Sequence, residues 1–345
     1  MSIDFLLLSN IPFQALPYPN FPFVAILLHS LDQRLKNLRT SALAESSRKT
    51  RSAQWRLYKQ FCQEHELQAL PASTSTVCRY IASLHSRGLQ YNTILNYAAS
   101  ITTLHHATNV QGPDMSHFSI TEALAGVKRT REELPNQREA LLPHHLLAIN
   151  QHLHSVSSRY RQTFWTACLL AFHTMVRSAN LFADRKTSPR HLTLQSVIPT
   201  NDGYILNFPA LKNERFLKKT VPIPITRCQT DDTLCAAPAL QRSITGRTDQ
   251  FAPLLIYTKN RKDVALTSAK FNRTLREVLR RAGFSASRFS VHSFRRGAAT
   301  YASQTGISAD SLKAQGNWKS DCYTCYISRD LELRHTFASS LSATL

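Results

Sequence analysis

Three stretches between residues 46 and 108 place apolar side chains every three or four positions, the spacing that makes one face of a helix. The three sets are Trp55, Tyr58, Phe61 and Cys62, then Val77, Tyr80, Ile81 and Leu84, and finally Ile94, Tyr97, Ile101 and Leu104. Serine and threonine precede the second stretch as candidate N-caps, and Gly88 follows it as a candidate C-cap. The pattern predicts an all-helical domain, to which we assign residues 46–127.

The parts of the chain on either side of this domain lack such a stripe. Residues 128–143 are charged and contain Pro135 and Pro143, which predicts a linker between two domains. Residues 1–45 include four prolines, and their longest apolar run, 21–28, is far shorter than the roughly 18 residues of a membrane-spanning helix. Asp4 and the absence of early Lys or Arg argue against a secretory signal. We expect residues 1–45 to be a poorly ordered tail, and the chain to contain no membrane segment.

Residues 144–345 mix two periodicities. The predicted helices are 146–153 and 160–176, and the predicted strands are 204–208 and 220–225, around a polar turn at 212–215. A further amphipathic helix is defined by Phe271, Leu275, Val278 and Leu279, and the final part is helical with breaks at Gly283, Gly306 and Gly316. The chain is therefore predicted to be mainly α, with a small β-sheet inside a mixed α/β second domain at residues 144–345.

The net charge of the chain suggests a binding partner. The 345 residues carry 42 Lys and Arg against 22 Asp and Glu, a net charge of +20, and 43% of them are hydrophobic. The hydrophobic share supports two folded cores, and the charge favours a polyanion, most commonly nucleic acid. The alternative is a protein whose basic faces are merely solvated. The candidate DNA contacts are Arg48, Lys49, Arg51, Arg273, Arg276, Arg280 and Arg296.

The seven cysteines are odd in number and scattered, which is typical of reduced intracellular proteins. Cys322 and Cys325 have the spacing of a redox or zinc half-site, but no second pair stands at zinc-ligand spacing. We therefore expect no metal there, and expect the two thiols to flank Tyr326 incidentally.

The most specific chemistry lies near the end of the chain. His292 and Arg295 are three residues apart and share a helix face, and Tyr326 follows a Gly316-x-Trp318 motif. Two donors that can grip a phosphate, followed by an oxygen nucleophile, suggest covalent chemistry on a phosphodiester. Taken singly, each residue has an ordinary alternative, since His292 fits a hydrogen-bonded core position and Tyr326 fits packing.

Two upstream residues are weaker candidates. Arg177 follows a buried helix, where an arginine needs an anionic partner, although alone it fits a salt bridge or a cap. Lys212 stands in the polar turn, where a lysine is commonly just exposed. Lys218 and Lys219 are close rivals for any role given to Lys212.

Taken together, in order and spacing, six residues resemble the active-site set of the tyrosine recombinase (phage integrase) family. They are Arg177, Lys212, His292, Arg295, Trp318 and Tyr326. The resemblance covers residues 46–345, and the sequences at 289–297 and 316–321 are most similar to recombinases of eukaryotic mobile elements. It implies a two-domain DNA clamp, in which a helical core-binding domain precedes the catalytic domain.

The resemblance also implies a mechanism and partners. Tyr326 would form a 3′-phosphotyrosyl link, Arg177 and Arg295 would hold the non-bridging oxygens, and Lys212 would protonate the leaving 5′ oxygen. His292 would assist proton transfer, and Trp318 would buttress the tyrosine or donate its indole N–H to the phosphate. No metal or nucleotide cofactor is implied; the partners would be double-stranded DNA and further copies in a homotetramer, in the nucleus if the source is eukaryotic and otherwise in the cytoplasm.

Several alternatives stay open. The family's nucleophile usually lies ten residues after the glycine, which selects Tyr326 over Tyr323. Asn180 stands where the family commonly has an acidic residue, so an inactive DNA-binding derivative remains a second hypothesis, and a type IB topoisomerase a third. Four apolar residues near the end could pack on a neighbouring protomer or on their own domain. They are Leu331, Leu333, Phe337 and Leu341.

Overall fold

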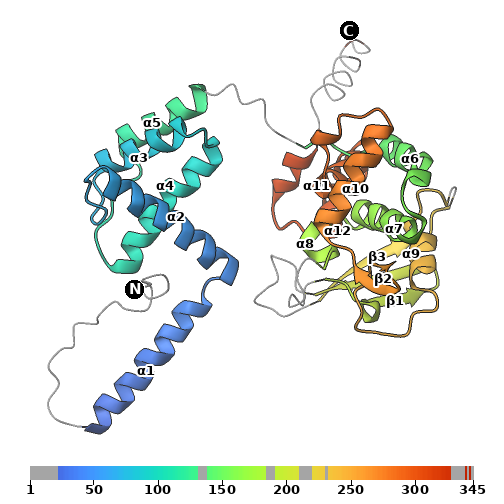
Figure 1. Cartoon of the computed structure of the whole chain (residues 1–345), viewed down its shortest axis with the longest axis horizontal. Coiled ribbons are helices and arrows are strands. Elements are labelled where there is room, and N and C mark those ends of the chain that lie inside the picture. Colours follow the sequence, from blue (N-terminus) through green and yellow to red (C-terminus); the bar gives the residue numbers. More distant parts are fainter. Residues whose placement is uncertain are drawn as a thin grey trace. The chain divides into compact units, whose positions relative to one another are not determined.

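The computed structural model describes residues 22–130, 138–183, 191–209, 220–229, 232–327, 339 and 342. The chain divides into two compact units, Met1–Leu134 and Pro135–Leu345 (Figure 1). The first unit is helical throughout its described part, and the second combines helices with small antiparallel sheets. The predicted fold class, mainly α with a small sheet in the second domain, is therefore confirmed.

The first unit packs its helices around the predicted apolar stripes. Its helices are α1 (Pro22–Ser41), α2 (Glu45–Glu64), α3 (Thr74–Ser86), α4 (Tyr91–Thr108) and α5 (Phe118–Thr130). Tyr58, Val77 and Ile94, one from each predicted stripe, are completely buried in its core. The N-cap of α3 is Ser73, whose side chain accepts a hydrogen bond from the backbone N–H of Thr76 at 3.1 Å. Gly88 follows α3 with a positive φ of 84°, as the predicted C-cap requires.

Two segments differ from the sequence-based expectation. Residues 22–41, placed in the poorly ordered tail, form the helix α1. Pro22 suits the first position of a helix, and leucines at 31, 35 and 38 continue on one side of it, although they are exposed. At the predicted linker, residues 128–130 still belong to α5, where the Thr130 hydroxyl donates to the Gly126 carbonyl oxygen at 2.9 Å. Residues 1–21 and 131–137 lie outside the described residues.

The second unit surrounds one buried helix. Its α-helices are α6 (Pro143–Gln151), α7 (Ser158–Thr174), α8 (Ser178–Leu181), α9 (Ala236–Ile244), α10 (Ser268–Arg281), α11 (Val291–Gln304) and α12 (Ala309–Gly316). As its sequence predicts, α7 is buried over most of its length; Phe164, Cys168 and Leu169 are completely buried. It contacts α9, α11 and the strands β3 (Val221–Thr226) and β4 (Ile256–Lys259), so it fixes the positions of the elements around it (Figure 1).

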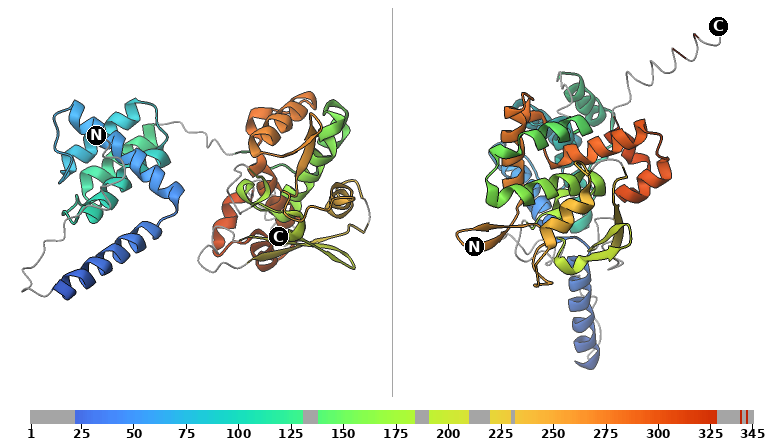
Figure 2. Two further views of the ribbon diagram at one scale, coloured as in Figure 1. Left: turned by 60° about the horizontal axis from the view of Figure 1, so that its bottom comes forward. Right: turned by 90° about the vertical axis from the view of Figure 1, so that its right-hand side faces the viewer.

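The strands form two antiparallel groups. The first is a three-stranded sheet in the order β1 (Val197–Thr200), β2 (Gly203–Phe208), β3, at one edge of the unit (Figure 2). Leu206 pairs with Ile223, and both side chains are buried, which sets the register. The second group is the hairpin of β4 and β5 (Lys262–Ala265). The prediction found β2 and β3 but not the other three strands, which are four residues long and largely exposed.

Of the helices that the structure describes, none is long and apolar enough to span a bilayer.

Candidate active site

The site begins where α7 ends. Met175 follows the helix in the left-handed conformation, with φ of 51°, and turns the chain sharply. The Thr174 hydroxyl donates to the Leu170 carbonyl oxygen at 2.6 Å and so finishes the last turn. The chain then continues extended through Arg177, a half-buried residue that precedes the short helix α8. The backbone carbonyl groups at the C-terminus of α7 and the Arg177 residue thereby lie close together.

The helix α11, which lies more than one hundred residues further along the chain, carries His292 and Arg295 on adjacent turns. Its start is held by Ser290 and Ser293, where the backbone N–H of Ser290 donates to the Ser293 hydroxyl at 3.1 Å. One turn later Gly297 lies so close to residue 141 that a Cβ atom there would stand 1.8 Å from the Leu141 carbonyl oxygen. Only glycine permits this approach, so the Arg-Arg-Gly sequence after Phe294 has a packing reason.

Arg295 is buried and forms no ion pair with a carboxylate of the described residues. Its side chain is 2% exposed, its Nη1 donates to the Met175 carbonyl oxygen, and its guanidinium carbon lies 3.9 Å from the centre of the Trp318 ring. The negative end of the α7 dipole and the indole face offset part of its charge. Its Nε and Nη2 atoms make no hydrogen bond of good geometry to a described residue, although the guanidinium interacts with the phenol of Tyr326. Burial and the neighbouring Arg177 lower the pKa of Arg295 to about 10.

The Gly-x-Trp motif places the indole. The helix α12 ends at Gly316, and Asn317 turns the chain with φ of 48°. The backbone N–H of Trp318 then donates to the Lys313 carbonyl oxygen at 2.9 Å. A Cβ atom on Gly316 would stand 1.8 Å from the Trp318 ring, so the glycine makes room for the indole. The buried indole N–H of Trp318 finds no partner in the described part of the chain.

The two candidate tyrosines differ in their surroundings. Both belong to the 3₁₀-helix η4 (Asp321–Tyr326). The Tyr326 ring is half-buried, with its centre 5.1 Å from that of His292 and 5.5 Å from that of Trp318. The guanidinium carbon of Arg295 lies 5.4 Å from the centre of the same ring. Tyr326 therefore lies within the cluster of candidate residues.

Tyr323 instead packs behind that cluster. It is buried in a small apolar core with Met175, Leu312 and Trp318, and the Lys313 Nζ atom lies 5.6 Å from its ring centre. Lys313 also forms an ion pair with Asp321, at 2.6 Å. Tyr323 thus anchors η4, whereas Tyr326 faces the histidine and the arginine.

Hydrogen bonds from α11 fix the backbone of η4 around the nucleophile candidate. The Arg296 Nη2 atom donates to the Cys325 carbonyl oxygen at 2.9 Å, and the Thr300 hydroxyl donates to the Tyr326 carbonyl oxygen at 3.1 Å. Arg296 was a candidate DNA contact, and the structure gives it this positioning role as well. The tyrosine is consequently held by the same helix that carries His292 and Arg295.

His292 is placed at the open side of the cluster. Its side chain is exposed, and its ring packs on that of Tyr326. The partial burial of the ring lowers the pKa of His292, and the positive charges of Arg295, Arg296 and Arg177 lower it further. The imidazole therefore favours its neutral form, which is able to accept a proton.

The structure brings together five of the six candidate catalytic residues, namely Arg177, His292, Arg295, Trp318 and Tyr326. Lys212 and its rivals Lys218 and Lys219 lie outside the described residues, as do Leu331, Leu333, Phe337 and Leu341. Asn180 is buried in α8, where its backbone N–H donates to the Arg177 carbonyl oxygen at 2.9 Å.

The candidate DNA contacts are mostly on the surface. Arg273, Arg276 and Arg280 are exposed on α10, and the last two line a hollow of about 500 Å³. Arg138 also lines this hollow, and sequence reasoning missed it because it stands alone between predicted elements. In α2, Lys49 and Arg51 are exposed and Arg48 is half-buried. Lys49 forms an exposed ion pair with Glu45 at 2.6 Å, which weakens its case as a phosphate contact.

Cys322 and Cys325 are free and exposed. Among the described residues there is no group of three or more His, Cys, Asp or Glu that could hold a metal ion.

No family model matches the chain, and no curated protein matches it in sequence. Solved structures do match it. The integrase of transposon Tn1549, in complex with transposon right-end DNA, is 14% identical with a TM-score of 0.59, over 89% of this chain and 98% of that one. The XerH site-specific recombinase, bound to a palindromic difH substrate, is 14% identical with a TM-score of 0.61, over 90% of this chain and 84% of that one.

A third structure, a lambda integrase dimer bound to a COC′ core site, is 17% identical with a TM-score of 0.51, over 90% of this chain and 81% of that one. All three are tyrosine recombinases of two domains. At these identities the likeness is one of fold, and it extends over both units of the chain. What the chain does must therefore be argued from its own site.

Proposed function

We propose that this protein is a site-specific DNA recombinase that cleaves and rejoins DNA through a 3′-phosphotyrosyl intermediate on Tyr326. One observation carries the proposal: three buried donor nitrogens, Nε and Nη2 of Arg295 and Nε1 of Trp318, make no hydrogen bond of good geometry to a described residue. Each such donor costs about 1–3 kcal/mol when left unsatisfied. A phosphate group bound beside Tyr326 would satisfy all three, because it offers several acceptor oxygens and negative charge.

The first step would be an in-line substitution at phosphorus. The Tyr326 oxygen forms a bond to the scissile phosphorus as the bond from phosphorus to the 5′ oxygen breaks. Arg177 and Arg295 neutralise the charge that develops on the non-bridging oxygens, where the planar fork of arginine fits best. Trp318 adds one hydrogen bond from its indole N–H.

Two proton transfers complete the step. The phenol of Tyr326 loses its proton as it attacks, and neutral His292, whose ring contacts that of Tyr326, is able to help remove it. Lys212 gives a proton to the leaving 5′ oxygen. Rejoining reverses the step, with a 5′ hydroxyl attacking the phosphotyrosine, so the energy of the broken bond is kept and no cofactor is consumed.

The wider setting follows from the same proposal. The partner is duplex DNA, supported by the net charge of +20 and by the exposed arginines of α10. The solved relatives named above are DNA complexes. We infer a homotetramer on DNA, as expected for a recombinase that exchanges strands between two sites. The similarity around His292 and Trp318 points to a eukaryotic mobile element and hence to the nucleus.

A second candidate function is favoured by one residue. Asn180 lies beside Arg177 and is buried, but an amide supplies no negative charge to offset the two arginines. A protein of this fold that binds DNA and no longer cuts it would tolerate such a position.

The experiment that separates the two uses the full chain. Protected DNA is first mapped by footprinting on genomic fragments, and the bound sequence is rebuilt as a nicked suicide duplex. The recombinase hypothesis predicts a covalent protein–DNA adduct that survives denaturing electrophoresis and vanishes after protease treatment. Binding to the mapped site without any adduct would establish the second candidate instead. A protein that protects no DNA would contradict both.

A further inference from the structure

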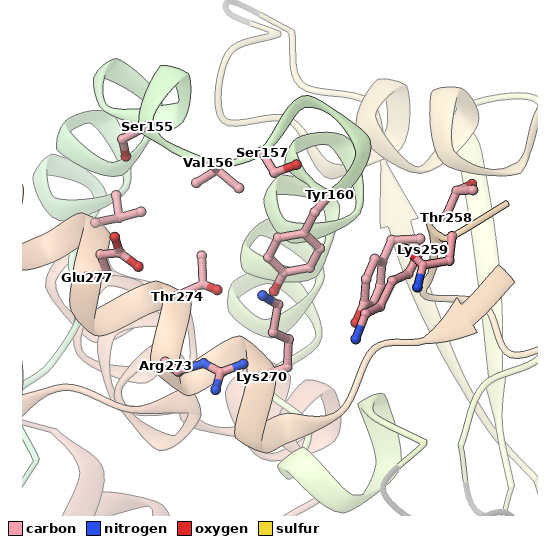
Figure 3. Close-up of a pocket in the computed structure, with 13 residues that line it drawn as sticks. Ser155, Val156, Ser157, Tyr160, Thr258, Lys259, Lys270, Arg273, Thr274 and Glu277 are labelled. Carbon is pink, nitrogen blue, oxygen red and sulfur yellow. The ribbon is translucent and has the colours of Figure 1, made fainter. Parts of the chain in front are cut away.

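A separate pocket lies at the opposite end of α7 from the candidate active site. It has a volume of about 370 Å³ and is lined by the start of α7, the strand β4 and one side of α10 (Figure 3). Tyr160 lies on its wall and Met175 lies beside Arg295, fifteen residues further along the chain. At a rise of 1.5 Å per residue this separates the two places by about 22 Å. The pocket is therefore not part of the cluster around Tyr326.

The pocket gathers positive charge from two elements. Lys259 comes from β4, and Lys270 and Arg273 come from α10; all three line the pocket (Figure 3). None of the three forms an ion pair within the described ranges of the chain. Glu277 is the one carboxylate among the lining residues, and it is held by Arg281 at 3.1 Å. The lining therefore carries three cationic side chains against one carboxylate, and that carboxylate is paired with Arg281, outside the pocket lining.

Two further features favour an anion. The first is the N-terminus of α7, a helix of 17 residues whose N-cap residue, Ser157, makes no side-chain capping hydrogen bond and lines the pocket. The positive end of the helix dipole is thus directed there. The second is Tyr160, which is 4% exposed and whose buried hydroxyl makes no hydrogen bond of good geometry to a described residue, although the Thr274 side chain on the same pocket wall interacts with it. Lys270 covers its ring, with the Nζ atom 5.0 Å from the ring centre.

We propose that this pocket is a second anion site that binds a phosphate group. A phosphate would pair with Lys259, Lys270 and Arg273 and accept a hydrogen bond from Tyr160. A basic surface that only contacts water would not require a buried hydroxyl beside its charged groups. Lys270 would move from the ring of Tyr160 to the ligand. The phosphate has two possible sources, the backbone of bound DNA or a free phosphorylated molecule. The first source rests on the function proposed above, and the second does not.

The test compares three single substitutions with one control. Tyr160→Phe removes the buried hydroxyl and leaves every charge in place, whereas Lys270→Gln and Arg273→Gln each remove one charge. Arg242→Gln removes one charge from the exposed side of α9, outside the pocket. Arg273 is exposed, so its variant is expected to fold even if the change at Tyr160 disturbs packing. Thermal denaturation checks each variant.

Binding is measured in two arms. In the first, inorganic pyrophosphate is titrated by calorimetry. A free-phosphate site predicts about a tenfold loss of affinity in all three pocket variants and no loss in Arg242→Gln.

In the second, the association constant for a linear mixed-sequence duplex is measured at several salt concentrations. A DNA-phosphate site predicts that the slope of log K against log salt concentration falls in magnitude by about 0.9 in the charge variants, beyond any change in the control. It also predicts weaker duplex binding by Tyr160→Phe at every salt concentration.

The proposal is overturned if the pocket variants match Arg242→Gln in both arms. Because both arms measure equilibrium binding and no cleavage, this failure is distinct from a failure to form the covalent adduct.

Discussion

Arg295 and the arginines of α10 carry the same side chain in opposite surroundings. Arg295 is 2% exposed, lies against an indole ring and has two donor nitrogens that make no hydrogen bond of good geometry to a described residue. Arg273, Arg276 and Arg280 project from the surface, where water satisfies the guanidinium group. The buried arginine has already lost its water before any ligand arrives, and the exposed ones have not.

This difference separates two kinds of contact with DNA. A donor held dry and fixed beside the reacting atoms stabilises charge in the transition state without further reorganisation. An exposed arginine attracts the whole duplex through counterion release and is screened by salt. We therefore expect substitutions in the buried set to change the rate of cleavage, and substitutions on α10 to change the strength of binding.

Among the arginine substitutions, the largest effect is expected from Arg295→Lys. Lysine keeps the positive charge but lacks the planar fork, so single-turnover cleavage should slow by about 10²- to 10³-fold. The matched control is Arg273→Lys, which should cleave at the wild-type rate. Equal reductions of the cleavage rate in the two variants would show that buried and exposed arginines contribute alike to cleavage, which contradicts the difference proposed between them.

Trp318→Phe tests the indole N–H separately from the indole ring. Phenylalanine can still lie beside the guanidinium of Arg295, but it donates no hydrogen bond to the phosphate. Cleavage should slow by about 10- to 100-fold, because one hydrogen bond to a charged group contributes about 1.5–3 kcal/mol. Wild-type cleavage by this variant would restrict Trp318 to packing. The melting temperature reports any loss of packing independently.

Removal of the three α10 charges by the triple substitution Arg273→Gln, Arg276→Gln and Arg280→Gln should weaken binding while leaving cleavage of fully bound DNA unchanged. The slope of log K against log salt should fall by about 0.9 for each arginine that touches a phosphate. Fluorescence anisotropy at several salt concentrations measures this slope. An unchanged slope would remove α10 from the DNA interface.

The smallest effect concerns acid stability. Since the folded state lowers the pKa of His292 below its usual 6.5, the unfolded chain takes up a proton at this residue before the folded chain does. The free energy of unfolding of the wild type should therefore fall, relative to His292→Gln, as the pH drops below about 6.5. Denaturant unfolding between neutral and mildly acidic pH measures the difference. A difference that stays constant with pH would mean that neither burial nor the nearby arginines lower the pKa of His292 in the folded state.

Part of this site could be predicted from the chain alone. The spacing of His292 and Arg295 places them on adjacent turns of one helix, and the apolar character of residues 160–176 predicts a buried helix. The structure gives a physical reason for the Gly316-x-Trp318 motif, because the missing side chain of Gly316 makes room for the indole. The choice between Tyr326 and Tyr323 rests on spacing in the sequence, and the structure adds their different ring contacts.

Other features could not be predicted from the sequence, because they depend on contacts between distant segments of the chain. The pocket around Tyr160 joins residues from three elements whose separations follow no periodicity. The carbonyl oxygen of Met175 receives the guanidinium of Arg295 from 120 positions away. The helix α1 was missed because the four prolines of residues 1–45 suggested a tail, although the last of them, Pro22, begins the helix.

The central claim, that Tyr326 is the nucleophile, is tested most directly by peptide mapping of the covalent adduct. Wild type, Tyr326→Phe and Tyr323→Phe are each incubated with the same nicked suicide duplex carrying the footprinted site. The account predicts an adduct in the wild type and in Tyr323→Phe, with the DNA attached to the peptide that contains Tyr326, and none in Tyr326→Phe. An adduct that persists in Tyr326→Phe, or maps to another residue, would contradict it.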